Sequence, residues 1–117
     1  MTLLPKQISY RAGDTSVPGI LYLPDDRATC AAVIVLHGSD GFKPNHEMIA
    51  RKLAKEGFAA LALTWFGGGS SRSRWSAVRA DDILQAVAFL EQQPAVDADR
   101  LGLHGFSRGG ALALIVA

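Results

Sequence analysis

The sequence predicts an α/β fold, with a mostly parallel sheet of about five strands, an antiparallel hairpin at its N-terminal end and helices on both faces. The first observation is a set of short aliphatic runs, AAVIVLHG, FAALALTWF and RLGLHGF, which are typical of strands covered on both faces. The second is that segments with helical periodicity separate these runs. The third is that the connections are short, which favours right-handed strand, helix, strand crossovers.

Length and composition indicate one globular domain over residues 1–117. Of its 117 residues, 49% are hydrophobic and 20% are charged, which is enough apolar material for a real core. Twelve Lys and Arg residues oppose eleven Asp and Glu residues, and these charges are scattered along the chain. Because no basic face results, we do not expect nucleic acid as a partner.

The chain carries no sign of secretion or of a membrane anchor. A single cysteine, Cys30, cannot form an intramolecular disulfide, and the start MTLLPKQISY lacks a basic region followed by an apolar one. The apolar run ALALIVA is much shorter than the ~20 residues that cross a bilayer. We therefore expect a reduced, cytoplasmic protein without a membrane partner.

The first two strands are predicted from alternation between Gln7 and Pro24. Apolar and polar residues alternate there around two pairs of turn-forming residues, Gly13-Asp14 and Pro18-Gly19. The pattern predicts two short antiparallel strands joined by a turn. From Ala31 the continuous aliphatic run AAVIVLHG predicts a buried strand, followed by the loop SDGFKPN.

A helix is predicted over HEMIARKLAKEG. Its apolar residues recur on one helical face, namely Ile49, Ala50, Leu53 and Ala54. Asn45 can cap its start, and Gly57 can end it.

The run FAALALTWF then predicts a strand, and GGGSSRSR a polar loop. A second helix is predicted over ADDILQAVAFLEQQ, where Ile83, Val87 and Leu90 recur at i, i+4 and i+7 and Pro94 marks the exit. RLGLHGF predicts a further parallel strand, which leads through Ser107 into the helical segment RGGALALIVA.

The motif G-x-S-x-G occurs at Gly105-Phe106-Ser107-Arg108-Gly109. Roughly one chain in 25 of this length would contain it by chance, but here it lies between a predicted strand and a predicted helix, where a nucleophile elbow belongs. A serine at the tip of so tight a turn needs small residues two positions before and after it, and Gly105 and Gly109 meet that need. The alternative is a plain glycine-rich turn with an exposed serine.

A second loop with catalytic potential is His37-Gly38-Ser39-Asp40-Gly41, at the end of the first central strand. A backbone N–H from this loop and the N–H of Arg108 can together form an oxyanion hole. We favour the N–H of Ser39 over that of Asp40. The alternative is a polar loop whose glycines only permit the turn.

In these motifs and their order, the sequence resembles the α/β-hydrolase superfamily. The likeness is to its dienelactone hydrolase-like branch and to the related acyl-CoA thioesterase and bile-acid acyltransferase C-terminal domains. It is carried by GILYLP, VIVLHGSDG, IARKLAKEGFAALALTWFGG and DDILQAVAFLEQQPAVDADRLGLHGFSRGG, and it extends from about Val17 to Ala117.

The resemblance implies a role for several residues. Ser107 matches the nucleophile, and Arg108 and Ser39 match the two oxyanion positions. His37, Gly38, Gly105 and Gly109 match supporting positions. Dienelactone hydrolases proper carry cysteine where this chain has serine, so the resemblance implies an ester or thioester substrate. It implies no cofactor, and no His or Cys pair has the spacing of metal ligands.

The acid and the histidine of a triad follow the nucleophile in this superfamily, whereas the present sequence ends at Ala117. We expect His37 to make a structural hydrogen bond, His46 to be solvated at a helix start, and His104 to flank the sheet beneath the turn. We therefore interpret residues 1–117 as a truncated hydrolase domain that lacks the strands carrying acid and histidine, and we expect the isolated chain to be nearly inert.

Three hypotheses follow. The leading one is the N-terminal half of a serine hydrolase for an ester or thioester. The second is a noncatalytic α/β module that forms homo-oligomers through the open sheet edge and the C-terminal helix. In the third, His104 or His46 of a second copy completes the site. The sequence does not determine the acyl group or the leaving group.

Overall fold

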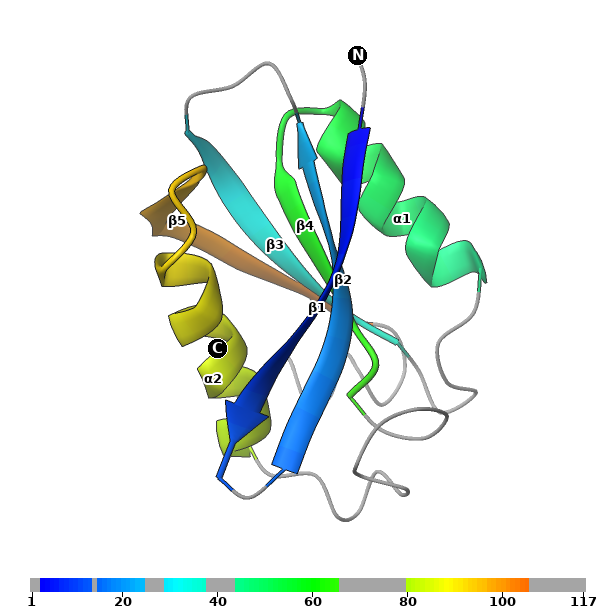
Figure 1. Ribbon diagram of the computed structural model, residues 1–117. Helices are drawn as coiled ribbons and strands as arrows, with labels where there is room; N and C mark the ends of the chain where they lie inside the picture. The colour runs from blue at the N-terminus through cyan, green and yellow to red at the C-terminus, as the bar shows by residue number, and fades with distance from the viewer. Residues whose placement is uncertain (1–2, 14, 25–28, 38–43, 66–79, 106–117) are drawn as a thin grey trace.

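Five strands form one mixed sheet between two helices, which confirms the predicted fold class (Figure 1). The computed structural model describes residues 3–13, 15–24, 29–37, 44–65 and 80–105. Their elements are β1 (Leu3–Ala12), β2 (Thr15–Pro24), β3 (Cys30–Leu36), α1 (Pro44–Lys55), β4 (Ala59–Leu63), α2 (Ala80–Glu91) and β5 (Val96–Gly105). The strand order is β1-β2-β4-β3-β5, in which β3 is parallel to both β4 and β5 and the remaining pairs are antiparallel.

The N-terminal hairpin is longer than the sequence predicted. Its turn lies at Gly13, whose φ of 65° is in the left-handed region that glycine adopts at little cost. The prediction that Pro18-Gly19 is a turn-forming pair is wrong, because both residues lie inside β2. The carbonyl of Pro18 accepts a hydrogen bond from the N–H of Thr64 at 3.0 Å. Gly19 lets β2 approach β4 closely, since a Cβ there would lie 3.0 Å from the carbonyl oxygen of Ala62.

One face of the sheet packs against α2. Alternate strand residues point to this face, as the two-residue period of a strand requires. The buried members of this core include Val17, Leu21, Ala32, Ile34, Leu36, Leu61 and Leu63 from the strands and Ile83, Ala86 and Leu90 from α2. Partly buried Val87 packs beside them, so the predicted apolar face of this helix is confirmed.

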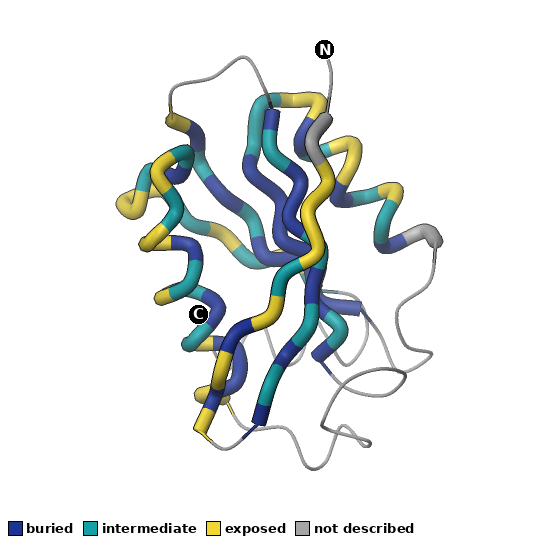
Figure 2. Tube along the Cα trace, viewed as in Figure 1, coloured by how far each residue is buried: buried dark blue, intermediate teal, exposed yellow. Residues whose placement is uncertain are grey.

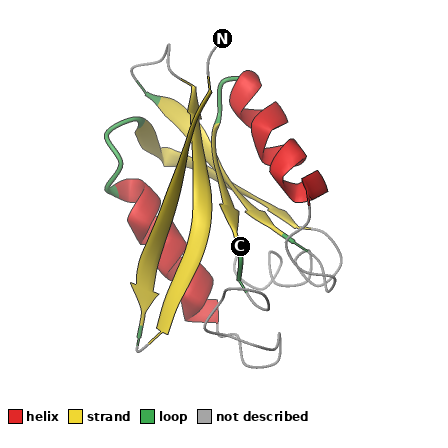
Figure 3. Ribbon diagram, turned by 45° about the vertical axis from the view of Figure 1, so that its right-hand side comes forward, coloured by secondary structure: helices red, strands yellow, loops and turns green. Residues whose placement is uncertain are grey.

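The opposite face packs against α1, and Figure 3 shows the sheet between the two helices. The buried members of this second core are Tyr22, Val35, Ala50, Ala54, Ala60 and Ala62. Ile49 and Leu53 pack against it, which confirms the predicted face of α1. Several of these residues are alanines, so the helix backbone can lie close to the sheet. Figure 2 shows that buried positions concentrate on the central strands.

Both ends of α1 have a local explanation. The helix begins at Pro44, so Asn45 lies within the first turn and not before it. Proline suits the first helical position because its fixed φ is helical and its missing N–H would have no partner there. At the other end, Gly57 has a φ of 100°, and the N–H groups of Gly57 and Phe58 donate to the carbonyls of Ala54 and Leu53, each at 3.1 Å. This is a Schellman cap, and it confirms Gly57 as the helix stop.

A β-bulge lies in β5, before the carboxyl end of the strand. Between the pairs Cys30 with Val96 and Ala32 with Leu101, the four residues 97–100 of β5 stand opposite Ala31 alone, so β5 has three extra residues there. Asp97 closes this bulge by accepting the N–H of Asp99 at 3.0 Å and the Nε–H of Arg100 at 2.9 Å. The hydrogen bond from the Asp99 N–H, and secondarily the one from Arg100, lowers the pKa of the Asp97 carboxyl. After the bulge, β3 and β5 pair residue by residue without a further break, from Ala32 with Leu101 to Leu36 with Gly105.

Candidate active site

The three parallel strands end level with one another. Leu36 of β3 pairs with Leu63 of β4 on one side and with Gly105 of β5 on the other. In open α/β sheets, ligands bind outside the carboxyl ends of such strands. This edge is therefore the candidate active site.

The predicted site residues fall into two groups. His37 and Gly105 lie at this edge, as the first residue after β3 and the last of β5. The other predicted residues, Gly38, Ser39, Arg108, Gly109 and the nucleophile Ser107, lie outside the described residues. Their roles therefore remain predictions.

His37 is fully buried within a group of aromatic rings. Its ring centre lies 5.5 Å from that of Trp65 at an interplanar angle of 32°, and 5.8 Å from that of His46 at 66°. The indole N–H of Trp65 donates to the backbone carbonyl of His37 at 3.0 Å. All three side chains are at most 2% exposed. We call these residues the aromatic cluster.

The prediction that His46 is solvated is wrong, because only 2% of it is exposed. His46 is the third residue of α1, and the first turn of that helix lies against the His37 ring. A helix start is usually exposed, so the local pattern could not indicate this burial. His104, by contrast, lies on β5 opposite Val35 and is exposed.

Sequence reasoning also missed Trp65. The run FAALALTWF placed Trp65 inside the predicted strand, whereas β4 ends at Leu63, two residues before it. One signal was available, because a buried tryptophan needs an acceptor for its N–H, and in the structure this acceptor is the His37 carbonyl at the end of the neighbouring strand. The position of that strand is known only from the sheet order.

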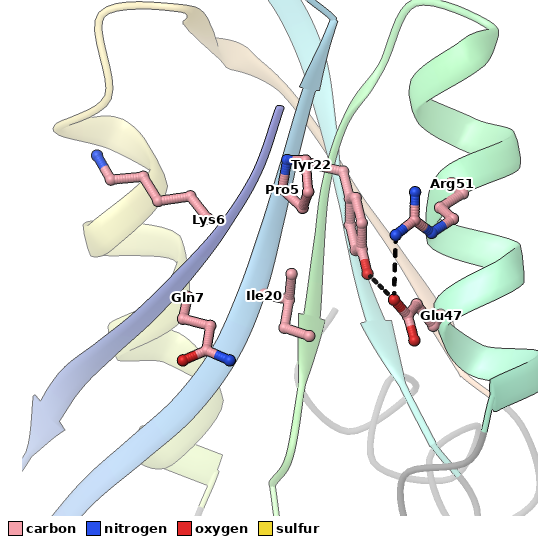
Figure 4. A pocket seen from close by; sticks show the side chains of 7 residues that line it. All are labelled: Pro5, Lys6, Gln7, Ile20, Tyr22, Glu47 and Arg51. Atoms are coloured by element: carbon pink, nitrogen blue, oxygen red, sulfur yellow. Dashed lines mark hydrogen bonds and ion pairs between the residues drawn. The ribbon is translucent and has the colours of Figure 1, made fainter. Parts of the chain in front are cut away.

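A second polar group connects α1 to the sheet, next to a cavity of about 330 Å³ (Figure 4). The Tyr22 hydroxyl donates to Glu47 Oε1 at 2.9 Å, and Nη2 of Arg51 donates to the same oxygen at 3.3 Å. The Arg51 guanidinium also lies 5.1 Å from the centre of the Tyr22 ring, in a cation–π arrangement. Burial, and then the Glu47 carboxylate, raises the pKa of Tyr22 to about 12. This group holds the helix that carries His46.

A comparable bond connects α2 to β1. The Tyr10 hydroxyl donates to the backbone carbonyl of Asp82 at 2.6 Å. Burial, and secondarily the Asp82 carboxylate, raises the pKa of Tyr10 well above its usual range. The bond fixes the first turn of α2 against the sheet.

Within the part of the chain that the structure describes, no three His, Cys, Asp or Glu side chains gather as a metal site requires. In the same residues, no helix is long and apolar enough to span a bilayer.

Comparisons with known proteins agree with the geometry. The sequence profile of the Dienelactone hydrolase family matches residues 17–117. The chain is 36% identical over 107 residues to acyl-coenzyme A thioesterase 6 of Homo sapiens, a match that covers 92% of this chain and 24% of that protein. The solved structure of m3DLH superposes with a TM-score of 0.86 at 30% identity, covering all of this chain and 55% of the other.

A dienelactone hydrolase from Anabaena variabilis shares the fold, with a TM-score of 0.77 at 22% identity over the whole of this chain and 58% of its own. The present chain spans about a quarter of the length of the curated thioesterases that it matches. The profile match covers most of the sequence and includes β3, α1, β4, α2 and β5. The chain therefore belongs to the dienelactone hydrolase family.

Proposed function

We propose that this chain supplies the nucleophile and the oxyanion hole of a serine hydrolase that acts on esters or thioesters. The observation that supports the proposal most is the pairing of Leu36 with Gly105. Gly105 is the first residue of the G-x-S-x-G motif, and Leu36 directly precedes His37-Gly38-Ser39. The two segments that would supply the nucleophile and the oxyanion donor thus begin on neighbouring strands at one edge of the sheet.

In the proposed reaction, the hydroxyl oxygen of Ser107 attacks the acyl carbonyl carbon and its proton passes to a general base. The N–H groups of Arg108 and Ser39 stabilise the oxyanion that forms. The leaving alcohol or thiol takes the proton as the acyl–serine ester forms, and water then hydrolyses that ester.

A thioester is the substrate class that the curated relatives favour. Several proteins at least 30% identical to this chain are named acyl-coenzyme A thioesterases. Serine at the nucleophile position supports an acyl–serine ester as the intermediate. The chain spans about a quarter of the length of those proteins. We propose an acyl-CoA thioester as its substrate.

Substitution of the nucleophile tests the proposal. In the full natural polypeptide, Ser107→Ala should lower kcat for acyl-CoA and p-nitrophenyl esters by about 10⁴-fold or more. The control is Ser9→Ala, which removes an exposed hydroxyl on β1 and should leave kcat unchanged. A fluorophosphonate probe should label the natural protein and the Ser9 variant, but not the Ser107 variant. Undiminished hydrolysis by Ser107→Ala would contradict the proposal.

The second candidate is a noncatalytic homo-oligomer. Among the described residues, β5 pairs only with β3, so its other side is an open edge that a second copy could extend. Light scattering over a range of concentrations tests this, because a monomer at all concentrations would argue against it. Burial of His46 opposes a site completed by that residue of a second copy, whereas His104 is exposed.

We also propose a cytoplasmic location. The cysteine Cys30 is buried, and its thiol donates to the carbonyl of Ala95 at 3.2 Å. A buried thiol of this kind behaves as a small apolar side chain and needs no oxidising compartment. Fractionation of cells that express the natural protein tests the location, and recovery outside the cytoplasm would refute it.

A further inference from the structure

The aromatic cluster joins the end of one parallel strand to the end of its neighbour. Trp65 lies two residues past β4, and His37 is the first residue past β3. The hydrogen bond between the Trp65 indole N–H and the His37 carbonyl, 3.0 Å long, connects positions 28 residues apart in the sequence. Since Trp65 is 2% exposed, this bond is shielded from competing water.

The aromatic cluster also includes a residue of α1, His46. The centre of the His37 ring lies 5.5 Å from that of the Trp65 indole and 5.8 Å from that of the His46 imidazole. His46 belongs to the first turn of α1. The segment 38–43, which contains Ser39, starts directly after His37 and ends directly before that helix. Both attachment points of the segment are therefore next to or within the cluster.

We propose that Trp65 is a positioning residue for the oxyanion hole. The carbonyl that accepts its N–H belongs to the peptide unit between His37 and Gly38. Because a peptide unit is planar, fixing this carbonyl also fixes the point from which Gly38, the single residue before Ser39, continues the chain. This inference rests on the proposed function, in which the Ser39 N–H stabilises the oxyanion.

The expected effect follows from the geometry that an oxyanion hole requires. Its donors act over about 2.7 to 3.1 Å, and a displacement of about 1 Å costs on the order of 100-fold in rate. Displacing the donor weakens its hydrogen bond to the developing oxyanion far more than it weakens binding of the substrate. Loss of the Trp65 N–H should therefore lower kcat and leave KM nearly unchanged.

A purely structural role for Trp65 predicts a different result. In that case its substitution would lower stability without a specific effect on kcat. Tyr10→Phe is a matched control, because it also removes one buried aromatic donor to a backbone carbonyl. Tyr10 joins β1 to α2 and has no part in the proposed reaction.

The test compares Trp65→Phe with Tyr10→Phe in the full natural polypeptide. Trp65→Phe should lower kcat for a p-nitrophenyl ester about 10- to 100-fold and should weaken inhibition by a trifluoromethyl ketone, which forms a tetrahedral adduct with serine, by a similar factor. KM should stay within about threefold. Tyr10→Phe should lower the unfolding temperature and leave kcat within about twofold. An unchanged kcat and unchanged inhibition in folded Trp65→Phe would overturn the inference.

A second variant decides the matter if Trp65→Phe does not fold. Site-specific incorporation of the benzothiophene analogue of tryptophan at position 65 exchanges only the indole N–H for sulfur. The same loss of kcat relative to the natural protein is expected, and its absence would overturn the inference. Full activity of Ser107→Ala would instead refute the proposed function. An inactive Ser107→Ala beside a fully active position-65 variant would refute this inference alone.

Discussion

Gly19→Ala should destabilise the protein, because β2 and β4 are too close at that position for a methyl group. The added Cβ would lie 3.0 Å from the carbonyl oxygen of Ala62 and 3.0 Å from Cδ2 of Leu63. The leucine methyl can move by a change of rotamer, but the carbonyl belongs to the backbone of a central strand. Relief therefore requires the two strands to separate locally.

The magnitude follows from two opposing effects. Forcing an extra methyl into a packed core costs about 1 to 3 kcal/mol. Replacing glycine by alanine also restricts the unfolded chain, which contributes about 0.4 to 1 kcal/mol in favour of folding. The net expectation for Gly19→Ala is a loss of about 1 to 2 kcal/mol in the free energy of unfolding.

Gly102→Ala is the matched control. Gly102 is in the same sheet, on β5, but a Cβ there would have no atom within 4 Å. Its φ is not in the left-handed region, so alanine fits without strain. Only the effect on the unfolded chain remains, and Gly102→Ala should be neutral or stabilise by up to about 1 kcal/mol.

Urea unfolding followed by circular dichroism measures both free energies. The two variants should differ by about 1 to 3 kcal/mol, with Gly19→Ala the less stable. If Gly19→Ala is as stable as the natural protein, or if the order of the two variants is reversed, the close approach of β2 to β4 is wrong.

Two further predictions concern α1. Gly57→Ala places a methyl group on a residue with a φ of 100°, so it should lower stability by about 1 to 2 kcal/mol in the same urea experiment; unchanged stability would argue against the Schellman cap. In the folded state the pKa of Tyr22 is raised to about 12, so folding favours the neutral phenol. The contribution of this neutral phenol to the free energy of unfolding is complete below pH ~10 and is lost as the pH rises from there through the folded pKa. Phenolate absorbance of the natural protein, compared with Tyr22→Phe, checks this, and native titration of Tyr22 near pH 10 would contradict it.

Much of the fold could be predicted because its determinants are local. The aliphatic runs predicted β3, β4 and β5, and the helical period predicted which faces of α1 and α2 are buried. Gly57 ended α1 as expected, since the left-handed conformation of a helix cap is a property of the residue itself. For the site, the sequence placed His37 and Gly105 at strand ends, which is where the structure has them.

The sequence by itself determined which segments become strands and helices and which apolar faces of the helices point inward, because these follow from residue types a few positions apart. Only the tertiary structure decided that Leu36 pairs with Gly105, that β2 continues through Pro18 and Gly19, and that His46 is buried. Each depends on residues far away in the chain. Burying a polar ring or an N–H is costly unless a partner is at hand, and such partners become available only when the strands assemble in their order.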